Sequence, residues 1–302
     1  MGSLLIRKGE TDMANTKESS SERYSSIKRQ EKIANILIYL ILIFVAITML
    51  VPFVWMILTA FKTVSESTQV DPFVILPSQW KFDNFETVIN TMGFTRLYIN
   101  TLLMILLRVL CAVATATFAG YAFARLEFPG KNLMFGLVLF QMMVPSQIFI
   151  IPQYVMVSKL GWINTVWGLL FPGLVTAFGT FLLRQAYMSL PKELEEAARL
   201  DGCNIGQTFI LVMAPLARSS MVALGIFTAV FAYKDLMWPM IVCPDTKSTT
   251  LASALAKMQG QFVSNYPQLM AAALIACLPM IVLYVIFQRQ FIEGIATSGG
   301  KL

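Results

Sequence analysis

Histidine is absent from the 302 residues of this chain. Because histidine is the commonest metal ligand and the usual proton carrier near neutral pH, its absence excludes a histidine-based metal centre and a histidine-dependent catalytic triad. Cysteine is scarce, and its four residues, Cys111, Cys203, Cys243 and Cys277, form no Cys-x-x-Cys pair. We expect them to be small apolar residues, without a disulfide framework or a metal site.

Charge is the second shortage. Charged residues make up 13% of the chain and hydrophobic residues 57%, whereas a soluble domain carries roughly 25% charged residues. No charged residue stands between Lys32 and Lys62, or between Lys131 and Lys159. These runs exceed the ~20 apolar residues that cross a bilayer, and they lack the alternation of barrel strands. The sequence therefore predicts an all-α membrane protein with about six transmembrane helices.

The apolar runs divide the chain into three parts. Residues 1–32, rich in serine, lysine and glutamate, are predicted to form a disordered cytoplasmic tail. Residues 33–288 hold the transmembrane domain, and residues 289–302 form a cytoplasmic C-terminal tail. The predicted spans are residues 33–60, 97–124, 132–157, 162–188, 209–233 and 266–288.

Prolines are expected to bend some of these spans. Pro145 and Pro152 fall in the third span, Pro172 in the fourth, and Pro215 near the start of the fifth. Proline removes a backbone donor and bends a helix, which helix bundles in membranes tolerate. Arg108 falls within the second span and must face protein or water.

Lysine and arginine predict which side of the membrane each loop faces, because cytoplasmic loops carry an excess of both. With both termini inside, fifteen of these residues fall on the inner side and seven on the outer side, and Arg108 lies within the membrane. The net charge of +6 is then explained by basic loops beside anionic lipid, with no nucleic-acid partner.

The connection over residues 189–208 is the only long inner one between predicted spans. Pro191 and the acidic residues after it favour the start of a short helix, and Gly202 is a natural stop. Asn204 with Gln207 is typical of a capping pair that begins a second helix. Such a short helix either docks into a groove of another protein or rests on lipid headgroups. Helical spacing places four of its residues on one face: Leu194, Ala197, Ala198 and Asp201.

The same loop carries a family resemblance. Its motif is Glu196-Ala197-Ala198, then Gly202, then residues 212–215 (Val-Met-Ala-Pro). This spacing resembles the inner-loop motif of permeases of ATP-binding-cassette importers, with valine and alanine where the family has isoleucine and leucine. Residues 233–239 (Tyr-Lys-Asp-Leu-Met-Trp-Pro) and the stretch from Gln288 to Ala296 resemble the carbohydrate importers of this family. They are similar to the second, shorter membrane subunit of the maltose-transporter group, and the resemblance covers about residues 35–298.

The resemblance implies a function and a set of partners. The chain would be a permease subunit of a binding-protein-dependent importer in a bacterial cell membrane, forming half of the translocation path for a carbohydrate, with an oligosaccharide as the expected substrate. Its expected partners are a second permease subunit, two ATPase subunits, an extracellular or periplasmic solute-binding protein and membrane lipid. The chain would not be an enzyme and would hold no cofactor, because ATP and magnesium bind to the ATPase subunits.

The resemblance also implies roles for particular residues. Glu196, Ala197, Ala198 and Gly202 would form the coupling helix that docks into a cleft on the ATPase. Three residues at the end of the fifth span and just after it are candidates for the substrate path or its outer mouth. As alternatives, Asp235 can pair with its neighbour Lys234, and the aromatic residues can belong to an interfacial belt. These three candidates are Tyr233, Asp235 and Trp238.

Other transport mechanisms remain as alternatives. An ion-coupled secondary transporter usually places ionisable residues at mid-membrane, and here Arg108 is the candidate, with no membrane carboxylate to relay protons. Within the importer family, the alternative substrates are monosaccharide derivatives, uronate-containing saccharides and glycerophosphate esters. The chain contains no G-x-x-x-x-G-K-[ST] loop for gripping nucleotide phosphates.

Overall fold

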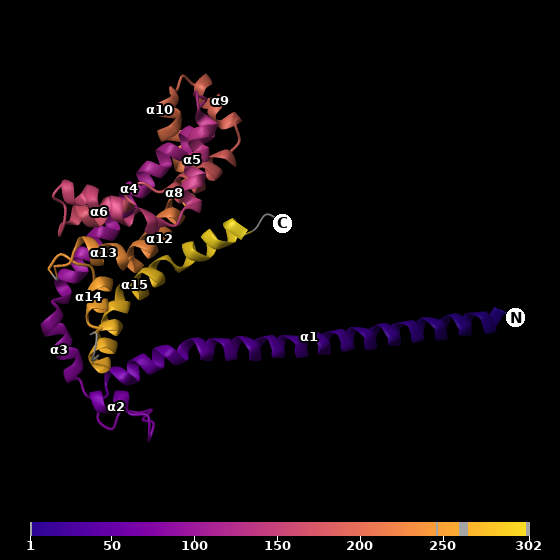
Figure 1. Ribbon diagram of the computed structural model, residues 1–302. Helices are drawn as coiled ribbons and strands as arrows, with labels where there is room; N and C mark the ends of the chain where they lie inside the picture. Colours follow the sequence, from indigo (N-terminus) through magenta and orange to yellow (C-terminus); the bar gives the residue numbers. More distant parts are fainter. Residues whose placement is uncertain (1, 246, 260–264, 300–302) are drawn as a thin grey trace. The chain divides into compact units, whose positions relative to one another are not determined.

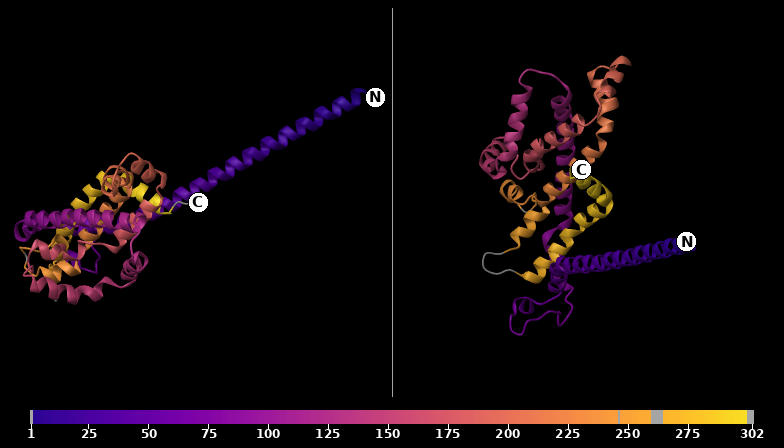
Figure 2. Two further views of the ribbon diagram at one scale, coloured as in Figure 1. Left: turned by 90° about the horizontal axis from the view of Figure 1, so that it is seen from above. Right: turned by 90° about the vertical axis from the view of Figure 1, so that its right-hand side faces the viewer.

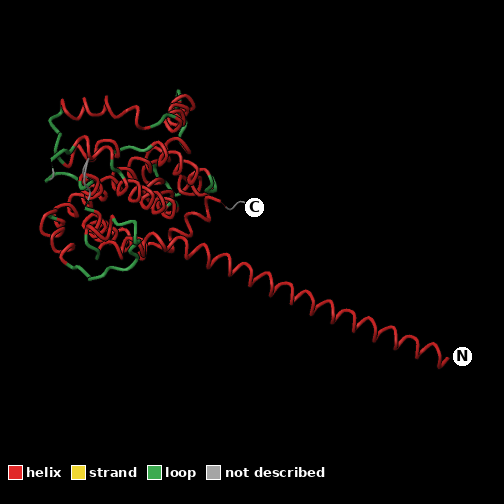
Figure 3. The backbone as a smooth tube through the Cα atoms, turned by 60° about the horizontal axis from the view of Figure 1, so that its bottom comes forward, coloured by secondary structure: helices red, strands yellow, loops and turns green. Residues whose placement is uncertain are grey.

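The computed structural model describes residues 2–245, 247–259 and 265–299. Within these ranges the chain consists of helices and connecting loops, and Figure 3 shows no strand. The predicted all-α class is thus confirmed. The chain separates into two compact units, Met1–Leu58 and Thr59–Leu302.

The first unit is made by the helix α1, Gly2–Ala60. Its part Glu31–Ala60 is long and apolar enough to span a membrane. In the structure α1 already begins at Gly2, and the disorder expected over residues 1–32 stays a prediction. Lysine, glutamate, arginine and glutamine lose little side-chain freedom in a helix, so this polar segment can continue the helix of the apolar run. The cytoplasmic location of the segment stays a prediction.

Two further helices are unbroken candidates for membrane spans. They are α4, Phe94–Arg125, and α15, Tyr266–Gly299. In α15 the part Tyr266–Gln288 is long and apolar enough to span a membrane. The candidate span has the bounds predicted for the last span, 266–288, although the helix itself continues to Gly299. Residues 300–302 of the predicted C-terminal tail lie outside the described residues.

Three candidate spans are bent pairs of helices. The helix α5, Lys131–Met143, meets η1, Ser146–Phe149, and α6, Ile150–Lys159, at 100°. Counting each pair as one span brings the number of spans in the described residues to six. The other two pairs are α7 (Val166–Leu170) and η2 (Phe171–Gly173) with α8 (Ala177–Met188), bent by 48°, and α10 (Ile205–Thr208), η3 (Phe209–Met213) and α11 (Ala214–Leu216) with α12 (Arg218–Lys234), bent by 71°.

The breaks follow the prolines. Pro145 lies between α5 and η1, Pro172 lies in η2, and Pro215 lies in α11 directly before the bend. Pro152 lies in the first turn of α6 and breaks nothing, because the first turn of a helix has no backbone bond for proline to remove. The bends expected at the other three prolines are thus present.

The connections contain short helices that the hydrophobic pattern does not predict. The segment before α4 holds α2, Val64–Thr68, and α3, Asp83–Met92. The segment before α15 holds α13, Met237–Val242, and α14, Leu251–Lys257. By contrast, the short helix predicted in the loop after α8 is present as α9, Glu193–Leu200.

The second unit is organised around α4, which packs against α8 and α12. Gly120 permits the close approach of α4 to α8, since a β-carbon built there would lie 2.8 Å from the Leu183 β-carbon and 2.9 Å from the Arg184 nitrogen. Figures 1 and 2 show α9 and α10 near the C-terminal end of α4, and α3 and α14 near its other end. At ~1.5 Å per residue, the 32-residue helix α4 is long enough to separate two groups of loops by the thickness of a membrane.

Candidate functional site

The short helix α9 ends in a hydrogen-bonded glycine turn. The Cys203 amide donates to the Ala198 carbonyl at 3.0 Å, and the Gly202 amide donates to the Arg199 carbonyl at 3.0 Å. Gly202 adopts φ +85°, a left-handed conformation in which a side chain is strained. The helix stop predicted at Gly202 is therefore confirmed, and the turn sends the chain directly into α10.

The next helix begins with the expected capping pair. The Asn204 side chain accepts from the Gln207 amide at 2.9 Å, and the Gln207 side chain accepts from the Asn204 amide at 2.9 Å. A single π-helical turn, Phe209–Met213, follows before Pro215. Proline lacks the amide that would continue the ladder, and π-turns are frequent at functional positions of helices.

The side chains of α9 face two directions. Glu195 and Ala198 are buried within the chain itself, whereas Glu196 and Ala197 are exposed. Leu200 leaves 89% of its surface exposed. Of the four residues expected on one face, Leu194, Ala197 and Asp201 are exposed, whereas Ala198 packs inward, where α9 contacts the π-turn η3. The outward face offers Glu196, Ala197 and Leu200.

Arg125, at the end of α4, contacts both α9 and the end of α8. Its guanidinium donates to the carbonyls of Tyr187 at 2.6 Å and Leu190 at 2.5 Å. Its Nε lies 3.9 Å from the Glu195 carboxylate, and both side chains are nearly buried. One arginine thus contacts the end of α8, the start of the loop and α9. The sequence identifies Arg125 only as an inner cation. It directly follows the second predicted span, far from residues 189–208 in the sequence, so no local signal points to its contact with α9.

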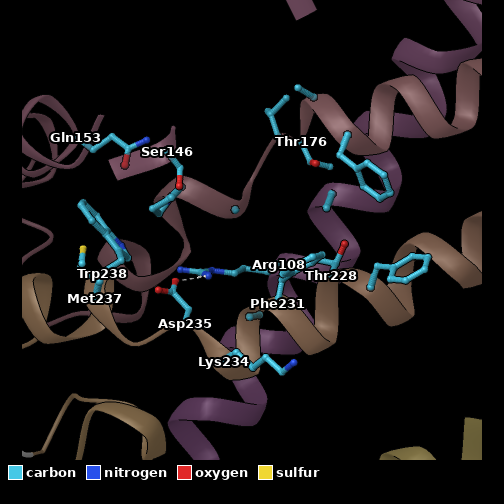
Figure 4. Close-up of a pocket in the computed structure, with 18 of the residues that line it drawn as sticks. Arg108, Ser146, Gln153, Thr176, Thr228, Phe231, Lys234, Asp235, Met237 and Trp238 are labelled. Carbon is cyan, nitrogen blue, oxygen red and sulfur yellow. Dashed lines mark hydrogen bonds and ion pairs between the residues drawn. The ribbon is translucent and has the colours of Figure 1, made fainter. Parts of the chain in front are cut away.

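A cavity of about 870 Å³ lies farther along α4. Its polar lining includes the side chains of Gln141, Gln147 and Gln153, which come from the two arms of the bent pair α5–α6. These three glutamines are polar residues within an uncharged apolar run, and they could have indicated a polar lining in this span. Figure 4 shows Ser146 and Gln153 on one side of the cavity and Thr176 and Thr228 on the other.

Arg108 and Asp235, which both line this cavity, form an ion pair. Arg108 Nη1 donates to Asp235 Oδ2 at 2.8 Å, as the dashed line in Figure 4 marks. Arg108 Nε also donates to the Leu169 carbonyl at 3.1 Å, and the guanidinium makes a second bond to the same oxygen. Gly173 leaves room for this arginine, since a β-carbon there would lie 2.6 Å from Arg108 Cδ.

The pair corrects one expectation and confirms another. Asp235 bonds to Arg108, which is 127 positions away in the sequence, rather than to its neighbour Lys234. Figure 4 shows the Lys234 side chain directed away from the pair. The expectation that Arg108 faces protein is confirmed by its burial.

The two aromatic candidates differ in position. Trp238 lines the cavity, but it is buried and its indole N–H donates to the Gly168 carbonyl at 2.8 Å. Tyr233 is not part of the cavity lining, and its hydroxyl donates to the Ala276 carbonyl of α15. The structure therefore brings Asp235 and Trp238 together and separates Tyr233 from them. The α9 motif lies apart from the cavity, near the end of α4 marked by Arg125.

The cysteines and carboxylates of the described residues form no group of three that could hold a metal ion. Cys243 is buried beside the cavity wall, and burial raises the pKa of its thiol to about 11. Its S–H points to the Thr165 carbonyl, which lies 3.8 Å from the sulfur. The described part of the chain thus offers a largely apolar cavity that carries several polar side chains, and a helical loop.

Comparison with known proteins adds the family. Residues 112–296, more than half of the chain, match the family described as binding-protein-dependent transport system inner membrane component. The arabinooligosaccharides transport system permease protein AraQ of Halalkalibacterium halodurans is 30% identical over 260 residues, covering 85% of this chain and 93% of the relative. The sn-glycerol-3-phosphate transport system permease protein UgpE of Salmonella typhi is 28% identical over 235 residues, covering 75% and 84%.

A solved structure has the same fold. It belongs to a bacterial ABC transporter involved in the import of the acidic polysaccharide alginate, and it matches with a TM-score of 0.75 and 22% identity over 86% of this chain and 97% of that chain. The family model and the AraQ relative identify the chain more closely than the fold does. The chain belongs to the binding-protein-dependent transport system inner membrane components, and it is a sugar permease subunit of an ATP-binding-cassette transporter rather than an enzyme.

Proposed function

We propose that this chain forms half of the translocation path for an oligosaccharide and couples the path to ATP hydrolysis by partner subunits. The expected complex contains a second permease, two ATPase subunits that bind ATP and magnesium, and an extracellular or periplasmic solute-binding protein. Both chain termini would lie in the cytoplasm. The observation that carries the proposal is the cavity between α4, the bent α5–α6 pair and α12.

The lining of the cavity suits a carbohydrate. Sugars offer many hydroxyl groups, and an amide side chain can donate to one hydroxyl while accepting from another. The glutamines and the hydroxyls of Ser146, Thr176 and Thr228 provide such groups. The rings of Phe178 and Phe227 meet edge to face, 6.1 Å apart, and add apolar surface for the faces of sugar rings.

The Arg108–Asp235 pair of the lining favours a neutral saccharide over a phosphate ester, and the other charged residue of the lining, Lys234, is directed away from this pair. The buried charge of Arg108 is compensated by Asp235 and by the Leu169 carbonyl. An arginine held in this way has few donors left for the bidentate bonds that bind phosphate. We therefore favour a substrate of the kind named for the AraQ relatives over the glycerol 3-phosphate named for the UgpE relatives.

The exposed face of α9 is the proposed contact with the ATPase. Glu196 and Ala197 would enter the cleft, Gly202 would shape the elbow, and Ala198 would hold α9 to its own chain. When the cleft closes on ATP, a helix seated in it moves as a rigid body. The attached helices α8 and α12 would then rock and open the cavity to the other side.

The experiment is sugar-dependent ATP hydrolysis by the reconstituted complex, with Gly202→Asp compared to wild type. A β-carbon at Gly202 meets nothing within 4 Å, so the substitution adds strain and charge without a clash inside this chain. We expect hydrolysis to fall about tenfold, the factor that corresponds to about 1.4 kcal/mol of lost docking free energy.

Gly161→Asp is the matched control. Gly161 also has a positive φ, +69°, and open space around its β-carbon, but it lies in the connection between α6 and α7. It should retain the hydrolysis rate. Equal loss in both variants would assign the effect to backbone strain, and unchanged hydrolysis in Gly202→Asp would refute the docking role of α9 and favour ion-coupled transport.

The choice of substrate has its own test. Neutral oligosaccharides should stimulate hydrolysis through the cognate binding protein, while glycerol 3-phosphate should not. Stimulation by glycerol 3-phosphate alone would overturn the argument from the compensated charge of Arg108.

A further inference from the structure

A second hollow, of about 420 Å³, lies at the opposite end of α4 from α9. It is formed by the end of α3, the first turn of α4 and the helix α14 with the loop before it. Three cations line it: Arg96, Lys247 and Lys257. The described lining contains no aspartate or glutamate, so the positive charge of the hollow is uncompensated by its own walls.

The cations are held on a fixed frame. Asn100 of α4 donates to the carbonyls of Lys247 at 3.0 Å and Thr249 at 3.1 Å. The Thr101 hydroxyl accepts from the Leu251 amide at 2.9 Å, which joins α14 to α4. Lys257 Nζ donates to the Pro244 carbonyl at 2.8 Å. Segments far apart in the sequence are thus joined beside the hollow, so that three cations line one site, and Lys257 Nζ also donates to the Cys243 carbonyl at 3.5 Å.

An apolar stripe continues from the hollow along α4. At helical spacing from Arg96, four apolar residues on one side of α4 are exposed in this chain, with the half-buried Asn100 beside the first of them. Ile99, at the top of the stripe, leaves 59% of its surface uncovered. The stripe consists of Ile99, Leu103, Leu106 and Leu110.

We propose that the hollow binds the phosphate of an anionic phospholipid whose acyl chain lies along this stripe. The three cations and the apolar stripe together favour a phospholipid over other ligands. A phosphate group satisfies three converging cations, and an acyl chain covers exposed leucine and isoleucine on a membrane-spanning helix. An acidic segment of a soluble protein would use the cations but leave the stripe bare, and a second permease would cover the stripe without needing the cations.

The test is lipid binding by the complete purified complex, measured by native mass spectrometry with added phosphatidylglycerol and with phosphatidylcholine as the neutral comparison. The variant combines Arg96→Gln, Lys247→Gln and Lys257→Gln. We expect each lost cation to weaken phosphatidylglycerol retention about fivefold, and the three together about a hundredfold. Phosphatidylcholine retention should stay unchanged.

The control variant removes one arginine and two lysines elsewhere, by Lys81→Gln, Lys159→Gln and Arg218→Gln, and should retain phosphatidylglycerol. A third variant, Leu103→Asn with Leu106→Asn, should also weaken the phospholipid but not the binding of inorganic phosphate. If the Leu103→Asn, Leu106→Asn variant retains phosphatidylglycerol fully, or if both charge variants behave alike, the site is not a phospholipid site. Crosslinking from Leu106 to the second permease would likewise overturn the proposal.

Discussion

The tertiary fold brings Asp235 into contact with the buried Arg108. Only 7% of the Arg108 side chain is exposed, and Asp235 is the acidic group that contacts it. We predict that Asp235→Asn lowers the free energy of unfolding by about 3 kcal/mol, because it leaves a buried charge without its counter-ion. Thermal or denaturant unfolding in detergent measures this change.

Glu127→Gln is the matched control for that prediction. Glu127 pairs with Lys131 at 3.1 Å, but 90% of its side chain is exposed. An exposed pair contributes about 0.5 kcal/mol at most, so the midpoint of unfolding should barely move. Similar losses in both variants would show that the Arg108–Asp235 pair contributes no more than a surface pair.

Cys243 gives a second prediction at this scale. Because burial raises the pKa of its thiol to about 11, the reactive thiolate is scarce at pH 7.5 and becomes abundant only as the pH approaches that value. In a variant that keeps Cys243 and Cys203 alone, maleimide at pH 7.5 should label the half-buried Cys203 first. Rapid labelling of Cys243 at that pH would contradict its burial in the intact protein.

At the scale of elements, α9 depends on a residue outside its own segment. Arg125 bonds to the carbonyls of Tyr187 and Leu190 and faces Glu195. We predict that Arg125→Gln lowers the sugar transported per ATP hydrolysed, since α9 would then move without carrying α4 with it. The lost charge-assisted contacts are worth about 2 kcal/mol. Parallel measurement of transport and hydrolysis in proteoliposomes gives the ratio.

Arg184→Gln is the control for this uncoupling. Arg184 donates to the Phe123 carbonyl at 3.2 Å and stacks on Phe135, so it joins α8 to α4 and α5 without touching α9. Its loss should cost stability but leave the transport ratio unchanged. An unchanged ratio in Arg125→Gln would remove Arg125 from the coupling path.

The elements themselves were predicted unequally well. The caps at Gly202 and Asn204 follow from local hydrogen bonding, so the sequence predicted both correctly. Proline positions predicted the bends because a missing amide acts within one turn. The helices α3 and α14 were missed, since they are short and are held by packing against α15 and α4 rather than by a long apolar period.

At the scale of the whole molecule, the contact of α4 with α8 holds the second unit together. Gly120→Val should lower the unfolding midpoint strongly, because a side chain there would meet the Leu183 β-carbon and the backbone at about the distances already found for a single added carbon, 2.8–2.9 Å. Overpacking of this kind costs about 1–3 kcal/mol or more. Gly136→Val is the control, since a β-carbon there meets nothing within 4 Å.

The orientation of the molecule is testable with Cys203 as the sole remaining cysteine. The excess of lysine and arginine predicts that the loop after α8 faces the cytoplasm. A membrane-impermeant maleimide should therefore label Cys203 in inside-out vesicles and not in intact cells. The reverse pattern would invert the predicted topology and place α9 out of reach of any cytoplasmic ATPase.

The sequence by itself determined the all-α membrane class, three of the bends and the helix caps, because these depend on composition and on interactions within a few residues. It also carried the inner-loop motif that placed the chain in its family. Only the tertiary structure decided which side chains meet. The Arg108–Asp235 pair, the Arg125 contact with α9 and the inward turn of Ala198 join residues from different helices. No local pattern encodes such meetings, because they arise from how the bent helices pack around α4.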